Sequence, residues 1–190
     1  LQVLERELNI DRNQLDFAPT CQPFSIRKNL SSRFQAYPCH ETYEVNEKND
    51  IYINLFNKLK EHVKPDIKKI RTFFRKIYRD ELEKSVCYTG KGLIHNDAEE
   101  FQLAGVIYLD DGYSFNAGTN LFTTNKYGEQ FEHDIQVGSV FNRCIVYPAD
   151  ILHQPSFDMN LKSRFIQTFF IFKDKELENK DKKYDINNCI

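Results

Sequence analysis

The stretch VFNRCIVYPADILHQPSFDMNLKSRFIQTFFIF, residues 140–172, decides the fold that we expect for this chain. It contains two apolar runs, 140–147 and 164–172, which are separated by a turn at residues 148–150 and a polar segment. Both runs are rich in β-branched and aromatic residues, which favour strands. The stretch therefore predicts two buried strands of a mainly β domain.

Further short runs of the same kind precede this stretch. Turn signals lie between them at residues 110–112 and 116–118, where Asp, Asn and Gly are concentrated. The other expected strands cover residues 86–88, 93–95, 103–109 and 120–123. Several short strands at this spacing predict a sandwich or a jelly roll with flanking helices.

The rest of the chain is divided by its pattern into three more segments of one domain. Residues 1–49 contain several prolines and are expected to form an N-terminal arm with a short strand at 42–45. Residues 50–85 are expected to form a helical support, with one helix capped by Asp50 and a second helix after Pro65. The strands occupy 86–172, and the charged tail 173–190 lacks periodicity.

Composition places the chain among ordinary soluble globular proteins. Hydrophobic residues make up 41% and charged residues 28%, and the formal net charge is -2. No apolar run is long enough to cross a membrane, and residues 1–20 lack the pattern of a signal peptide. The 5 cysteines are scattered, which is typical of reduced thiols, so we expect a cytoplasmic location. Abundant Asn, Lys and Ile, with no Trp, resemble coding by an AT-rich viral or bacterial genome.

A basic pattern in the expected second helix keeps one nucleic-acid interpretation open. If residues 66–79 were helical, their positive side chains would share one face opposite the apolar residues. These side chains belong to Lys68, Lys69, Arg71, Arg75, Lys76 and Arg79. A solvated face is the more ordinary interpretation, and salt-dependent binding of nucleic acid would distinguish the two.

The tripeptide His95-Asn96-Asp97 is the first candidate for chemistry. In an extended segment residues i and i+2 point to the same side, so the imidazole and the carboxylate converge. Two histidines and one carboxylate on one side of a metal form the facial triad of non-haem Fe(II) oxygenases, which leaves the opposite side open. The second imidazole must therefore come from a distant segment of the chain.

His153 is the candidate that we favour for this second imidazole. It follows the strong apolar run 140–147 and the turn at 148–150, so it lies where a new strand begins. His133, its rival, lies in a polar stretch. Arg164 opens the next apolar run, where a buried guanidinium is costly unless a carboxylate meets it. Thr168 follows four residues later, on the same face of the expected strand.

The order His95-x-Asp97, His153 and then Arg164 resembles the Fe(II)/2-oxoglutarate-dependent dioxygenase superfamily, most closely its prolyl-4-hydroxylase-like branch. The resemblance covers about residues 86–172. Within it, residues 87–92 resemble the strand and loop before the metal motif, 107–109 the tyrosine strand, and 118–122 a Gly/Thr strand start. A poorly characterised phage and bacterial group of such oxygenases is also similar. The resemblance implies a cupin-like double-stranded β-helix with the metal between two facing sheets.

The same resemblance implies a role for each candidate residue. His95, Asp97 and His153 would hold Fe(II), and Arg164 would bind the distal carboxylate of the cosubstrate 2-oxoglutarate. Tyr108, Thr168 and Tyr88 would also contact the cosubstrate. O₂ would be the oxidant, and ascorbate an accessory reductant. Because related halogenases lack the carboxylate, the presence of Asp97 favours hydroxylation.

The primary substrate is left open by the sequence. The branch suggests a prolyl or other peptide side chain, whereas a free amino acid, a small metabolite or a nucleobase are alternatives. A peptide or a small molecule is favoured over nucleic acid. Two other classes compete with the oxygenase: a non-catalytic jelly-roll binding protein, and a cupin-type zinc or manganese enzyme. The second would need another imidazole or a Glu near the metal and would have no use for Arg164.

Overall fold

The computed structural model describes residues 2–4, 39–42, 44–84, 94–111, 113–124 and 131–174. Antiparallel strands dominate these ranges, together with two helices, α1 (Asp50–His62) and α2 (Arg79–Glu83). The expected strand at 86–88, most of the N-terminal arm and nearly all of the tail lie outside the described residues. The fold-class prediction, mainly β with flanking helices, is confirmed for the rest.

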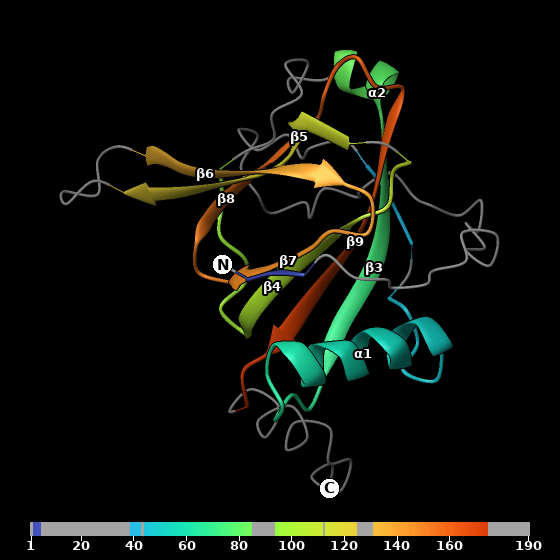
Figure 1. The fold of residues 1–190 in the computed structure, drawn as a ribbon, viewed down its shortest axis with the longest axis vertical. Helices are drawn as coiled ribbons and strands as arrows, with labels where there is room; N and C mark the ends of the chain where they lie inside the picture. Colours follow the sequence, from blue (N-terminus) through green and yellow to red (C-terminus); the bar gives the residue numbers. More distant parts are fainter. Residues whose placement is uncertain are drawn as a thin grey trace, which may run out of the picture.

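The strands form two sheets, which can be followed in Figure 1. The larger sheet has the order β1 (Gln2–Leu4), β7 (Cys144–Pro148), β4 (Phe101–Tyr108), β9 (Ser163–Phe172), β3 (Ile70–Tyr78) and β2 (His40–Glu41). The smaller sheet has the order β6 (Phe131–Val140), β5 (Tyr113–Thr124) and β8 (Leu152–Ser156). An isolated antiparallel bridge from His95 to His153 continues the smaller sheet beyond β8.

The chain passes repeatedly from one sheet to the other. It runs from β3 to the bridge at His95, back to β4, then to β5 and β6, to β7, to β8 and finally to β9. Neighbours within each sheet are antiparallel. This alternation between two facing antiparallel sheets is a double-stranded β-helix, the jelly-roll architecture that we expected.

Each face of the larger sheet packs against a different partner. The inner face meets the smaller sheet in a core that includes Val106, Ile145 and Ile166 from one sheet and Leu121 and Val137 from the other. The outer face is covered by α1, which lies across the strands at one end of the sheet (Figure 1). Most residues of the central strands β4 and β9 are therefore buried on one side or the other.

The predicted second helix after Pro65 is wrong, because residues 70–78 form β3. This strand pairs with β9 over nine residues, from Ile70 opposite Ile171 to Tyr78 opposite Ser163. β3 has buried residues on both faces, so its apolar residues do not alternate with polar ones. Their spacing is therefore also compatible with the period of a helix. The segment 50–85 thus supplies one long helix, a central strand and the short helix α2.

Two smaller expectations also need correction at this end of the chain. Asn49, and not Asp50, caps α1, since its side chain accepts a hydrogen bond from the amide of Ile51 at 2.8 Å. The expected strand at 42–45 is displaced, because β2 is His40–Glu41. Residues 42 and 45 nevertheless donate backbone hydrogen bonds to β3. Both errors concern the ends of elements, where neighbouring residues are almost equally suitable.

The expected strands from residue 103 onward and the turn at 148–150 are largely as predicted, with two differences, while Gly112 of the turn expected at 110–112 lies outside the described residues. The run 140–147 is broken by a turn at residues 141–142, so β7 begins at Cys144. Residues 116–118 do not form a turn but an irregularity inside β5, between Ser114 and Gly118. Gly and Asn mark bulges as well as turns, which explains the second error.

No helix in the described ranges is both long and apolar enough to cross a membrane.

Candidate metal centre

The backbone brings the two histidines of the predicted triad side by side. His95 and His153 exchange both backbone hydrogen bonds of the isolated bridge, at 3.0 Å and 2.8 Å. Their ring centroids are 4.3 Å apart. The amide of Asp97 donates to the carbonyl of Ala149 at 2.9 Å, which holds the 95–97 segment against the start of β8. One potential ligand atom from each of these three residues lies within 4.8 Å of the others.

Asp97 is a buried carboxyl group with an unsatisfied oxygen. Its Oδ2 is buried and has no hydrogen-bond partner, and it lies 3.8 Å from Nε2 of His153. Burial raises the pKa of Asp97 to about 6, against the lowering influence of His95 and Arg75. A buried carboxylate oxygen without a partner is unfavourable, so this site is suited to a cation.

His153 has one ring nitrogen committed to the protein and the other available. Its Nδ1 lies 3.1 Å from the carbonyl oxygen of Ile151, which can only accept a hydrogen bond, so Nδ1 carries the proton. Nε2 then keeps its lone pair and faces Asp97. Burial, with a smaller contribution from His95, lowers the pKa of His153 to about 4, so the ring is neutral at pH 7. The tautomer and charge are those that a metal ligand requires.

The donor set fits a divalent transition metal. Two imidazoles and one carboxylate within 4.8 Å of one another are the ligand types of the facial triad of non-haem Fe(II) proteins. The orphaned Oδ2 of Asp97 supports the fit, because a bound cation would satisfy it. The backbone of His133, the rival candidate, belongs to β6 and pairs with Phe122 of β5.

Arg164 lies on the inner face of β9 and is only 1% exposed. Its Nη1 donates to the carbonyl of Ser156 at 2.9 Å and its Nη2 to the carbonyl of Gly118 at 3.0 Å, while Nε has no partner. Within the described part of the chain no carboxylate pairs with it. Neutral carbonyls orient the guanidinium but leave its charge uncompensated, which favours an anionic ligand.

Tyr108 lies next to Arg164, whose guanidinium carbon is 5.6 Å from the centre of the phenol ring. The Tyr108 hydroxyl donates to the hydroxyl of Thr119 at 2.9 Å, and both side chains are buried. Burial raises the pKa of Tyr108, against the lowering effect of Arg164. Thr168 is buried too, and its hydroxyl makes a long hydrogen bond of 3.4 Å to the carbonyl of Phe73. Tyr88, the remaining candidate, lies outside the described residues.

Three residues around Arg164 were not singled out as site residues in the sequence: Gly118, Thr119 and Ser156. Gly118 has φ 141°, and a Cβ there would lie 1.9 Å from the carbonyl oxygen of Val137. Only glycine therefore allows the close strand contact that presents its carbonyl to Arg164. In the sequence, the Asn-Ala-Gly triplet at 116–118 marks this position, but the same triplet is also typical of a turn.

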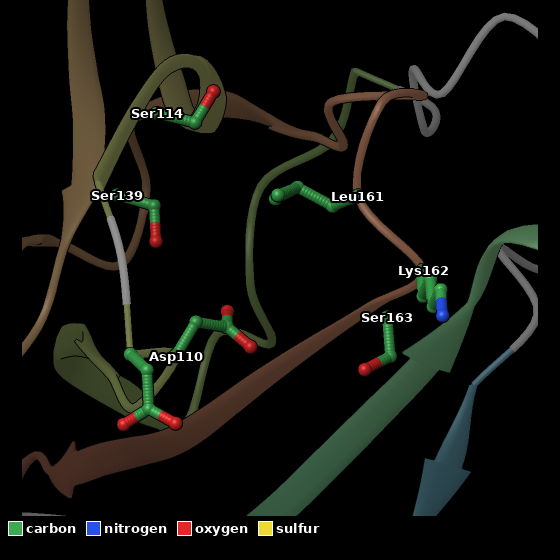
Figure 2. Close-up of a pocket in the computed structure, with 7 residues that line it drawn as sticks. Asp110, Ser114, Ser139, Leu161, Lys162 and Ser163 are labelled. Carbon is green, nitrogen blue, oxygen red and sulfur yellow. The ribbon is translucent and has the colours of Figure 1, made fainter.

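A hollow of about 250 Å³ lies beside Ser163, the residue before Arg164 in the chain, as Figure 2 shows. It is lined by Leu161 and by the polar residues Asp110, Asp111, Ser114, Ser139, Lys162 and Ser163. Asp110 accepts the amide hydrogen bond of Phe165, next to Arg164. Asp110 and Asp111, which lie between β4 and β5, are therefore on the Arg164 side. None of the triad residues lines this hollow.

The basic side chains of residues 68–79 do not form the expected helical face. They lie on and beside β3, and most of them are paired with acids. The pairs are Lys68–Asp174, Lys69–Glu47, Arg71–Glu44, Arg75–Glu41 and Arg79–Glu83. The ammonium of Lys76 lies over the ring of Tyr78 at 5.3 Å. Pairing removes most of the unbalanced positive charge that nucleic-acid binding would need.

Comparisons with known proteins give structural similarity at low sequence identity. No family model matches the chain, and no curated protein matches it in sequence. A prolyl-4-hydroxylase of Pseudomonas putida is similar with 13% identity and a TM-score of 0.49, over 75% of this chain and 76% of that one. A Trichoplax adhaerens prolyl hydroxylase, solved with a peptide fragment of hypoxia inducible factor, has 12% identity and a TM-score of 0.49, over 74% and 66%.

A third solved structure is an oxidoreductase of the 2-oxoglutarate–Fe(II) oxygenase family from Burkholderia pseudomallei. It has 12% identity and a TM-score of 0.43, over 71% of this chain and 65% of that one. At this level of similarity the functional argument depends on the geometry of the site in this chain.

Proposed function

We propose that this protein is an Fe(II)- and 2-oxoglutarate-dependent dioxygenase that hydroxylates its substrate. The observation that supports this most strongly is that two groups of opposite charge have buried polar atoms without partners. One is the cluster of His95, Asp97 and His153, which has an orphaned carboxylate oxygen. The other is Arg164, which no described carboxylate neutralises. A metal-chelating anion with a second carboxylate would satisfy both groups.

Each residue has a separate role in this proposal. His95, Asp97 and His153 hold the metal, and the Nδ1 contact of His153 with Ile151 fixes the orientation of its ring. Arg164 receives the distal carboxylate of 2-oxoglutarate in bidentate geometry. Tyr108 and Thr119 form a hydroxyl pair beside it, in which the Thr119 hydrogen is available for the same carboxylate. Thr168 and Tyr88 remain candidates from the sequence for the same pocket.

The protein contributes geometry and exclusion of water, and the bound group contributes the chemistry. With Fe(II), 2-oxoglutarate and O₂ bound, that chemistry is oxidative decarboxylation to succinate and CO₂, coupled to hydroxylation of a substrate C–H bond, with ascorbate as an accessory reductant. We propose a peptide side chain, prolyl or other, as the substrate, on the resemblance of residues 86–172 to prolyl-4-hydroxylases. A small metabolite is the alternative. Pairing of the basic residues makes nucleobases the weaker choice.

The direct test is an anaerobic difference spectrum of the Fe(II) protein on addition of 2-oxoglutarate. Bidentate chelation is expected to produce a weak visible charge-transfer band, and admission of O₂ should then yield succinate. An Arg164→Met variant should still bind Fe(II) but require roughly a hundredfold more 2-oxoglutarate for the band, since a buried charged contact is lost. A wild-type protein that binds Fe(II) without producing the band or succinate would contradict the proposal.

The same experiment separates the competing classes. A non-catalytic jelly-roll protein would bind neither Fe(II) nor 2-oxoglutarate tightly. A cupin-type zinc or manganese enzyme would retain its metal on purification without oxygen, and it would be insensitive to replacement of Arg164. The two imidazoles and one carboxylate of the cluster, with no further imidazole or Glu in the group formed by the described residues, favour the oxygenase.

A further inference from the structure

Arg75 is a second arginine on the inner face of the larger sheet. It lies on β3, opposite Ile166 of β9, and it is two residues from Phe73, so both side chains point to the same face. Phe73 contacts Phe170 at 5.9 Å between ring centroids, and Phe170 packs against the core between the sheets. Tyr147 belongs to the same core cluster, and its ring lies 4.9 Å from the ring of His153, so the inner face that carries Arg75 is connected by packing to the metal cluster.

The guanidinium of Arg75 is oriented by two contacts, but only some of its N–H donors have hydrogen-bond partners. Its Nε donates to Oε2 of Glu41 at 2.5 Å, and its plane lies over the ring of Phe73, 4.7 Å from the centroid. The side chain is 28% exposed. Within the described part of the chain, the terminal nitrogens Nη1 and Nη2 make no hydrogen bond. An oriented fork with unused donors is a preorganised recognition element.

The charge balance indicates what this fork can bind. Arg75 and Glu41 neutralise each other, so the pair has little net attraction for an anion. A carboxylate arriving at Nη1 and Nη2 would also approach the negative charge of Glu41. A neutral carbonyl oxygen has no such repulsion, and it can accept from both terminal nitrogens. The geometry therefore favours an amide or peptide carbonyl over a free acid.

We propose that Arg75, oriented by Glu41 and Phe73, positions the primary substrate by donating from its terminal nitrogens to a neutral carbonyl oxygen close to the carbon that reacts. This inference depends on the proposed function, since it assigns a substrate contact in the same pocket. It makes Arg75 a specificity-determining residue and an amide-containing molecule the preferred substrate. Arg164 and Arg75 then have separate ligands: the cosubstrate carboxylate and the substrate carbonyl.

The chain contains a matched control for Arg75. Arg71 lies four residues earlier on the same face of β3, and its Nε pairs with Glu44 at 3.0 Å, as Arg75 pairs with Glu41. Among the described residues, only Arg75 of the two stacks on Phe73, whose ring contacts Phe170 of the core between the sheets. Arg71→Gln therefore removes the same kind of ion pair from the same strand but leaves this stacked contact in place.

The test measures succinate formation by the Fe(II) protein with two sets of probes: capped tripeptides acetyl-Gly-X-Gly-amide, with each amino acid as X, and the corresponding free amino acids. Capped peptides should raise the rate above the substrate-free rate, and free acids should not. For the best peptide, Arg75→Gln should raise KM about tenfold with little change in kcat, since hydrogen bonds of uniform binding are lost. Arg75→Lys should give an intermediate KM, and Arg71→Gln an unchanged KM.

Glu41→Gln is an independent test of the charge argument. Its amide oxygen can still accept the hydrogen bond from Nε of Arg75, but the negative charge is removed. It should allow free amino acids to stimulate turnover. The inference is overturned if free acids stimulate the wild type as well as peptides do, if neither set stimulates it, or if Arg71→Gln and Arg75→Gln change KM equally. The anaerobic 2-oxoglutarate band of the wild type distinguishes these failures: its absence counts against the oxygenase proposal, and its presence confines the failure to Arg75.

Discussion

The two faces of the larger sheet differ in the kind of polar group that they leave without a partner: neutral on the outer face and charged on the inner face. On the outer face, α1 closes an apolar core of side chains such as Leu59, Phe74 and Phe169. The buried hydroxyl of Tyr52 on that side lies 3.3 Å from the backbone nitrogen and oxygen of Ile70. The neutral amide oxygen of Gln167 is the unsatisfied polar atom of that face, whereas on the inner side the unsatisfied atoms belong to Asp97 of the metal cluster and to the charged Arg164. The same sheet thus has one face organised mainly for packing and one that presents charged groups suited to binding a ligand.

The difference shows which part of the sheet provides stability and which part provides function. Apolar burial on the outer face is favourable by itself, since it needs no ligand. A buried carboxylate oxygen and an uncompensated guanidinium reduce stability unless a ligand satisfies them. We therefore expect substitutions on the outer face to change the free energy of unfolding, and substitutions on the inner face to change ligand binding.

The largest effect is expected for His153→Ala, which removes one ligand of the proposed metal. Fe(II)-dependent succinate formation should fall about a hundredfold or more, because even indirect changes around a metal site cost ten- to a hundredfold. His62→Ala, at the exposed end of α1, is the control and should keep full activity. Equal activity of the wild type and the His153 variant would contradict the assignment of function to the inner side of the sheet.

Leu59→Ala tests the outer face. Leu59 is 1% exposed, so its truncation leaves a cavity, and the free energy of unfolding should fall by about 2–5 kcal/mol. Urea denaturation of the metal-free protein measures this loss. Ile53→Ala, on the exposed side of the same helix, should change it by less than about 0.5 kcal/mol. The folded Leu59 variant should still give the 2-oxoglutarate band, and loss of the band would mean that the two faces are coupled.

Asp97→Asn should increase the stability of the metal-free protein while preventing metal binding. Because burial raises the folded-state pKa of Asp97 to about 6, its carboxyl group favours folding below pH 4, and this contribution is lost as the pH rises through 6. The neutral amide avoids the loss, so the variant should be more stable at pH 8, by up to about 3 kcal/mol. The difference should vanish below pH 4. Urea titrations at both pH values measure it, and equal stability at pH 8 would contradict the prediction.

The smallest effect is expected for the removal of single hydroxyl groups, for which each face of the sheet offers one buried tyrosine. Tyr108→Phe removes the hydroxyl that bonds to Thr119 on the inner side, and Tyr52→Phe removes the hydroxyl next to Ile70 on the outer side. Each change should cost about 1 kcal/mol of stability. Only Tyr108→Phe should also weaken 2-oxoglutarate binding, by roughly fivefold in the anaerobic titration. Weakening by both variants would show a general loss of structure instead.

Local pattern was sufficient to predict much of this molecule. Asp97 follows His95 by two residues in an extended segment, so their convergence needed no tertiary information. Arg164 stood out because a guanidinium within an apolar run must be buried and needs a partner. The pattern failed for β3, where burial of both faces erased the alternation that distinguishes a strand from a helix. It also failed at Gly118, where a bulge and a turn share the same residues.

The sequence by itself determined the class of the fold, the candidate ligands and the buried arginine, because these depend on residue type and short-range spacing. Only the tertiary structure decided that His153 meets His95 across a bridge and that carbonyls of Gly118 and Ser156 orient Arg164. The sequence pattern assigned Arg75 to an exposed helical face, and only the tertiary structure placed it on the inner face of β3. These contacts join residues far apart in the chain, so they depend on strand register, which no local pattern contains.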